Sequence, residues 1–176
     1  MAAGGIALAV VGGTGLTAMA APASAHNVAH AVRSVKFTGN YKGTAQLLID
    51  NGVVTISSVK GNGTGTVVGK STVMGKGSAS ASAQCDPFTG TGFIQGPKAK
   101  INFKVLQSKS SGCSSGLSGA VKVAFHGVAQ ATGGTGAGAG ASGTLSFKGT
   151  LALGGTSGKQ AGSYTVALTG TLQLKG

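Results

Sequence analysis

Side chains that could carry out acid–base chemistry are scarce in this sequence. Among its 176 residues the only carboxylate side chains are those of Asp50 and Asp86, and there is no Glu. Hydrolysis in the manner of most glycosidases requires two carboxylates that face one bond. Asp50 precedes Asn51-Gly52 and Asp86 precedes Pro87, so turn formation explains both residues. We expect no paired carboxylates at a catalytic site.

A nucleophilic serine site has little support either. His126 and the many serines supply members of a Ser-His-Asp triad only on paper. The segment Gly112–Gly116 reads Gly-Cys-Ser-Ser-Gly and is not the GxSxG elbow of serine hydrolases. The run Gly61–Gly65 does not end in Gly-Lys-Ser/Thr followed by a helix, so a hairpin turn explains it better than a phosphate loop. We predict no catalytic residues and disfavour an enzymatic activity.

The histidines suggest one metal site. If the chain is cleaved after Ala25, the α-amine and imidazole of His26 could chelate copper with a second imidazole from His30 or His126. This arrangement resembles the histidine brace of lytic polysaccharide monooxygenases, although the chain has no Trp and only two Tyr. A histidine-containing leader and a half-exposed strand residue are the favoured interpretation. We therefore expect no metal ion and no other cofactor.

The excess of basic residues is the strongest chemical signal. Fourteen Lys and Arg residues, all after residue 25, oppose two Asp and give a formal net charge of +12. Such a field attracts nucleic acid, anionic cell-wall or extracellular polymers and acidic lipid. Lys is poorly suited to bidentate reading of bases, and few aromatic residues are present to stack on them. We expect no sequence-specific nucleic acid partner. For the lysines we favour a solvated coat that keeps the protein soluble. Binding of anionic polymers is the alternative.

The first 25 residues differ from the rest of the chain. They carry no charge, contain the apolar run Ile6–Val11 and end in Pro22-Ala23-Ser24-Ala25. This pattern predicts a secretory signal peptide cleaved after Ala25. A membrane anchor is the alternative, but glycines interrupt the segment and we expect no stable membrane span after cleavage. Residues 26–34 would then form a leader, and residues 35–176 a single domain of a secreted, extracellular protein.

Cys85 and Cys113 are the only cysteines. Because an exported chain meets an oxidising environment, we predict that they form a disulfide bond. Closing a loop of this size should stabilise the fold by roughly 3–4 kcal/mol.

One seven-residue pattern recurs along the chain. It has apolar residues at positions 1 and 3, Gly at position 5 and an apolar or small residue at position 7. Side chains alternate between the two faces of a strand, so the Gly shares a face with the large apolar residues. A core-facing Gly in a strand marks a bend or a close approach of backbones, which are features that curl a sheet into a barrel. The four copies are Val35–Tyr41, Val123–Ala129, Leu145–Leu151 and Val166–Leu172.

The elements between these copies are also strands and turns. Asn51-Gly52 predicts a type I′ hairpin that places Ile49 opposite Val54 and Leu47 opposite Ile56. Apolar residues keep one parity from Tyr164 to Leu174, which predicts a long final strand. Residues 108–119, which hold Cys113, and the Gly-rich run 133–143 are expected to be exposed loops.

The predicted fold is all-β, a closed or nearly closed antiparallel barrel of about eight strands with one disulfide; a β-sandwich is the alternative. Core-facing glycines remove side-chain volume, which could leave a cavity for a small apolar ligand. Facing Phe and Leu side chains could instead cover these glycines, and we favour this second interpretation. The residues expected to line such a cavity are Phe37, Phe103, Phe125 and Tyr164.

The motif Gly133-Gly134-Thr135-Gly136, followed by residues 139–145, resembles a turn and strand of the allene oxide cyclase and dirigent barrels. The resemblance covers about residues 127–174 and implies an eight-stranded barrel with a central cavity. It does not extend to activity, because Ala137-Gly138 stands where those families place an aromatic residue and neither Asp matches their acidic positions. The overall pattern also resembles uncharacterised exported proteins of actinobacteria.

These observations favour a secreted, non-enzymatic barrel with a binding or structural role in the extracellular space or cell envelope. One alternative is a dirigent-like or cyclase-like protein that handles a small hydrophobic ligand. The other is an electrostatic binder of anionic polymers.

Overall fold

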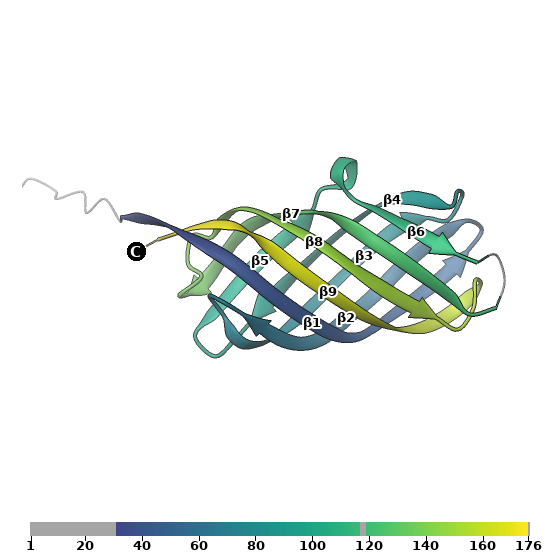
Figure 1. The fold of residues 1–176 in the computed structure, drawn as a ribbon, viewed down its shortest axis with the longest axis horizontal. Helices are drawn as coiled ribbons and strands as arrows, with labels where there is room; N and C mark the ends of the chain where they lie inside the picture. Colours follow the sequence, from purple (N-terminus) through teal and green to yellow (C-terminus); the bar gives the residue numbers. More distant parts are fainter. Residues whose placement is uncertain (1–30, 117–118, 176) are drawn as a thin grey trace, which may run out of the picture.

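The computed structural model describes residues 31–116 and 119–175, most of which belong to one antiparallel β-sheet (Figure 1). The sheet closes on itself because β1 pairs with both β2 and β9, and β3 pairs with β4. The structure is therefore the predicted barrel and not the β-sandwich. The strands are β1 Val32–Asp50, β2 Val53–Gly65, β3 Gly69–Ser80, β4 Cys85–Gln95, β5 Ala99–Val105, β6 Ser111–Ser115, β7 Val121–Gly136, β8 Ser142–Leu153 and β9 Gly158–Lys175.

Two short strands share one position in the barrel wall. Both β5 and β6 lie between β4 and β7 and run antiparallel to each of them. Between them the chain leaves the wall in the 3₁₀ turn η1, Gln107–Lys109. Buried Ser110 fixes this excursion, since its hydroxyl donates to the Leu106 carbonyl at 2.8 Å and accepts from the Val128 amide at 3.2 Å. The nine strands thus occupy eight positions.

The expected hairpin is present with the expected register. Asn51 and Gly52 have φ of 48° and 75°, the left-handed values that a type I′ turn requires. Ile49 pairs with Val54 and Leu47 pairs with Ile56. The pairing of β1 with β2 shifts register between Leu47, which pairs with Ile56, and Gln46, which pairs with Ser58, so that Ser57 has no partner on β1. At its other end β1 begins at Val32, so residues 32–34, which we expected in the leader, belong to the barrel.

The core-facing glycines allow aromatic rings from the same strand or from a neighbouring strand to lie against the backbone. A Cβ atom on Gly39 would lie 2.9 Å from the Tyr41 ring and 3.1 Å from the Phe37 ring. A Cβ on Gly149 would lie 2.6 Å from the Phe125 ring. The side chains of neighbouring residues therefore cover these glycines, which confirms the interpretation favoured from the sequence.

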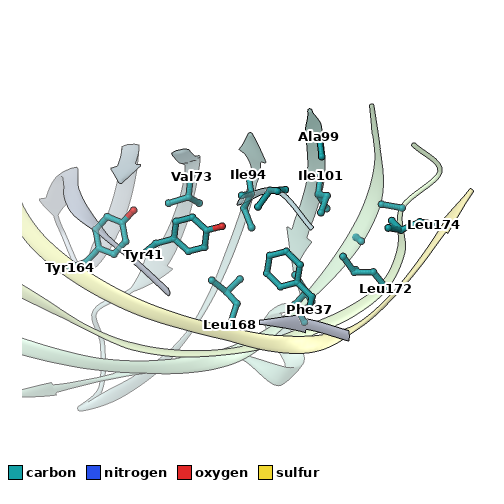
Figure 2. Packing of buried hydrophobic residues seen from close by; sticks show 14 of the residues in the cluster. Phe37, Tyr41, Val73, Ile94, Ala99, Ile101, Tyr164, Leu168, Leu172 and Leu174 are labelled. Carbon is teal, nitrogen blue, oxygen red and sulfur yellow. The ribbon is translucent and has the colours of Figure 1, made fainter. Parts of the chain in front are cut away.

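One end of the barrel is tightly packed. Its side chains point toward one another from strands on all sides of the barrel (Figure 2). Each large apolar side chain that is fully buried contributes about 1.5–3 kcal/mol to stability. Those with less than 2 % relative exposure are Phe37, Ile94, Ile101, Leu145, Leu172 and Leu174.

The Gly-rich run 133–143 closes this packed end, which corrects the expectation of an exposed loop. Strand β7 continues to Gly136, and a tight turn brings Ala141 into the core with 3 % exposure. The amide of Lys175 at the end of β9 donates to the Ala139 carbonyl at 3.0 Å. Small side chains suit this turn because its backbone packs directly against neighbouring strands. Within the described part of the chain, no helix is long and apolar enough to span a membrane.

Candidate binding surfaces of the barrel

The four residues expected to line a ligand cavity all face the interior, but they occupy space there. Phe37 has 0 % exposure and lies in the packed end. The Phe103 ring lies 2.8 Å from the position of a Cβ on Gly92, and Phe125 covers Gly149 in the same way. Tyr164 has 6 % exposure, and its hydroxyl lies where a side chain on Gly61 would be. These rings take up the volume that the glycines release.

The half of the interior nearest the disulfide holds a cluster of three aromatic rings that could not be recognised from the sequence. The ring centroid of Phe88 lies 6.4 Å from that of Phe125 and 5.9 Å from that of Phe147. All three side chains are half-buried. Such edge-to-face and tilted pairs are favourable arrangements of aromatic rings. Phe88 lies on β4, whereas the other two rings lie on β7 and β8. The cluster can therefore be recognised only when the positions of these strands in the barrel are known.

Two tyrosine hydroxyls lie inside the barrel in different environments (Figure 2). The Tyr41 hydroxyl shares a hydrogen bond of 2.9 Å with buried Ser71. Burial raises the pKa of Tyr41, and the bond to Ser71 partly opposes this increase. Burial alone raises the pKa of Tyr164 to about 12. Among the described residues, the Tyr164 hydroxyl has no hydrogen-bond partner. Neither phenol is therefore a base at neutral pH.

The free energy of unfolding is expected to decrease as the pH rises from about 10 to about 12. An unfolded tyrosine loses its proton near pH 10, whereas Tyr164 in the barrel has a pKa of about 12. Between these values the unfolded chain binds fewer protons than the native protein, so stability decreases with pH. Urea denaturation at several alkaline pH values should show a shallower decrease for Tyr164→Phe than for the wild type.

Tyr41→Phe is the matched variant for this experiment. At neutral pH it should lose about 1 kcal/mol, because the hydrogen bond between Tyr41 and Ser71 is removed, while Tyr164→Phe should cost little because its hydroxyl has no partner among the described residues. Equal alkaline slopes for the wild type and Tyr164→Phe would contradict this description of Tyr164.

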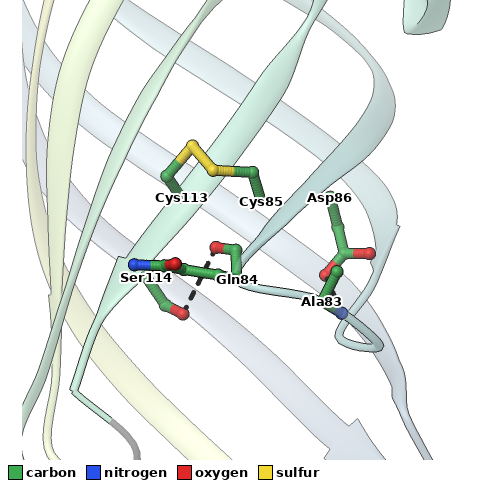
Figure 3. The surroundings of a disulfide bond; sticks show 6 residues. All are labelled: Ala83, Gln84, Cys85, Asp86, Cys113 and Ser114. Carbon is green, nitrogen blue, oxygen red and sulfur yellow. Dashed lines mark hydrogen bonds between the residues drawn. A yellow bond between two sulfur atoms is a disulfide. The ribbon is translucent and has the colours of Figure 1, made fainter.

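The predicted disulfide joins β4 to β6 (Figure 3). Cys85 begins β4, whereas Ile94, in the packed end, lies near the other end of the same strand. Cys85 and Cys113 are direct cross-strand partners, so Cys113 lies in a strand and not in the loop expected from the sequence. Asp86, beside Cys85, is buried. Its carboxylate accepts hydrogen bonds from the Ser82 hydroxyl at 2.9 Å and from the Ala83 amide at 3.0 Å. Asp86 therefore stabilises the loop before β4.

The histidines proposed as copper ligands are not brought together in the described structure. His26 and His30 lie outside the described residues. His126 is exposed on β7, where its cross-strand partners are Ser111 and Lys148. Within residues 31–116 and 119–175, no three His, Cys, Asp or Glu side chains are grouped closely enough to hold a metal ion.

The basic side chains cover the outer wall of the barrel. All fourteen Lys and Arg residues lie in the described ranges, and thirteen of them are exposed. The other, Lys100, is half-buried because its ammonium group lies 4.1 Å from the centroid of the Phe93 ring, a cation–π contact. Of the two carboxylates, Asp86 is buried and Asp50 is exposed at the first hairpin. Among the described residues, Asp50 is therefore the only exposed carboxylate side chain beside thirteen exposed cations.

Two shallow depressions open on this outer wall. One, of about 510 Å³, lies over Gly43 and includes Lys42, Thr150 and Thr165 from β1, β8 and β9. The other, of about 570 Å³, lies where the wall is interrupted between β5 and β6 and includes Thr89, Lys104 and Ser108. Thr and Lys side chains in both can donate hydrogen bonds to anionic or hydroxyl groups.

Comparison with protein-family models, curated proteins and solved structures gave no match to this chain.

Proposed function

We propose that this protein is a secreted, non-enzymatic barrel that binds anionic polymers of the extracellular space or cell envelope on its outer wall. The observation that supports the proposal most strongly is the placement of the charge. Most of the interior-facing residues are apolar or Gly, whereas thirteen of the fourteen cations are exposed to solvent. An elongated cationic surface attracts polyanions over a distance set by the ionic strength.

Two further observations agree with this proposal. Asp86 is hydrogen-bonded to its own loop, and the interior phenols keep their protons at neutral pH, so these groups are poor candidates for acid–base catalysis. Export is supported by the signal-like segment that ends at Ala25 and by the disulfide, since disulfides persist in oxidising compartments.

Retention on an immobilised polyanion tests this function. On a dextran sulfate column the protein should be retained at about 0.05 M NaCl and elute before about 1 M, because the Debye length decreases from above 10 Å to about 3 Å over this range. A column of uncharged dextran is the control and should not retain the protein. Elution of the protein in the void volume of the dextran sulfate column at low salt would contradict the proposal.

A further inference from the structure

We propose that the outer face of β4 is a binding track for a linear acidic polysaccharide, an inference that rests on the function proposed above. Ile94 has 0 % exposure and points into the barrel, so its neighbours on β4 point outward. The outward residues are uncharged and include two hydroxyls, one aromatic ring and one amide. They are Pro87, Thr89, Thr91, Phe93 and Gln95, and we refer to them as the β4 track.

Lysines lie on both sides of this track. Thr91 pairs with Lys76 on β3 and with Lys104 on β5. Gln95 pairs with Lys100 on β5. Neighbouring strands are about 4.8 Å apart, so these ammonium groups border an uncharged strip one strand wide. An extended polymer on β4 would have cations beside it on both edges.

The aromatic residue of the track lies between these lysines. Phe93 is half-buried, pairs with Met74 on β3 and is in cation–π contact with Lys100. A half-exposed ring presents a flat apolar surface, onto which the C–H face of a sugar ring can pack. The hydroxyls of Thr91 and Thr89 and the amide of Gln95 can form hydrogen bonds with sugar hydroxyl groups.

The larger depression of the outer wall continues the track at one end. Thr89 and Lys104 border both the depression and the track. The depression exists because β4–β5 pairing ends at Gly90 and Val105, whereas β4–β6 pairing begins at Pro87. Track and depression together extend for roughly 26 Å along β4, which is long enough for several sugar residues.

The side-chain chemistry favours a polysaccharide over a nucleic acid. Proteins that bind single strands stack successive bases on several aromatic side chains, and Phe93 is the single aromatic residue of the track. The flanking cations are Lys, which attract carboxylate or sulfate groups as point charges and lack the bidentate geometry of Arg. In a linear polymer with one acidic group per sugar, the acidic groups can pair with the lysines while a sugar ring packs on Phe93.

The opposite wall of the barrel provides a matched control. Strand β9 is four positions from β4 around the eight-position ring, and β8 and β1 are its neighbours. Lys148, Lys159 and Lys36 are exposed on these three strands. Replacing them with Gln changes the net charge as much as replacing Lys76, Lys100 and Lys104.

The test measures binding of polygalacturonate oligomers by the full protein at about 0.1 M salt. The triple variant Lys76→Gln/Lys100→Gln/Lys104→Gln should bind about tenfold more weakly or worse, and Lys36→Gln/Lys148→Gln/Lys159→Gln should lose less than about threefold. Phe93→Leu should lose several-fold while it keeps the net charge. Circular dichroism melting establishes that each variant is folded.

The alternative results separate the two proposals. Equal losses in the two triple variants would overturn the track and leave the function of the cationic wall intact. Failure of the wild type to bind either polygalacturonate or dextran sulfate would overturn both. Tighter binding of an oligothymidine than of polygalacturonate, lost in Phe93→Leu, would overturn the assignment to a polysaccharide.

Discussion

A Phe37→Ala variant is expected to unfold with a free energy about 3–5 kcal/mol below that of the wild type. Phe37 has 0 % exposure in the packed end of the barrel. Its ring lies against Gly39 and Gly65, where the side chains of Tyr41 and Val68 also pack. Removal of the ring costs its transfer free energy and leaves a cavity in this packed end.

Equilibrium urea denaturation measures this loss. Phe93→Ala is the matched control, because it removes the same ring from the outer wall, where the side chain is only half-buried. It should cost much less than Phe37→Ala. Similar losses in the two variants would contradict the assignment of Phe37 to the inside of the barrel.

Removal of the disulfide should be the next largest perturbation. The bond between Cys85 and Cys113 spans 28 residues, and loss of a loop closure of this length costs about 3–4 kcal/mol through the greater entropy of the unfolded chain. The barrel should still form, because β6 also pairs with β7 over residues Ser111–Ser115.

The Cys85→Ser/Cys113→Ser variant and the reduced wild type should lose the same free energy of unfolding in urea. A reducing agent should then have no further effect on the Ser variant, which serves as the internal control. A variant as stable as the oxidised wild type would contradict the role assigned to the bond.

The sequence was sufficient to predict those strands that alternate between large apolar and polar residues. The register of the first hairpin followed from Asn51-Gly52, because a two-residue turn with positive φ allows only one pairing. The inward direction of Gly39 and Gly149 followed from the parity that they share with Phe37 and Phe147. Alternation is a local property, so it can be recognised without knowledge of the neighbouring strands.

Strand β6 could not be predicted in this way. Residues Ser111–Ser115 contain only Ser, Gly and Cys and show no apolar alternation. They are extended because β4 and β7 lie on either side and bond to their backbone. The same reason applies to the Gly-rich run 133–143, where β5 pairs with residues up to Gly136. Backbone pairing imposed by barrel closure determines both segments.

The candidate sites required cross-strand register that only the structure provides. Four cavity residues were placed on the correct face, but the sequence does not show that Phe103 lies against Gly92 or that Phe125 lies against Gly149. Likewise, the position of Lys100 and Lys104 beside the outward residues of β4 depends on the pairing of β4 with β5.

Backbone amide chemical shifts, measured while polygalacturonate oligomers are added to the isotopically labelled protein, test the central claim most directly. The claim is that the outer wall along β4, and not the interior of the barrel, is the binding surface. The largest shifts are expected at Thr89, Thr91, Phe93 and their neighbours Lys76 and Lys104. Shifts concentrated at interior residues such as Tyr164 and Leu168, or on β9 on the opposite wall, would contradict it.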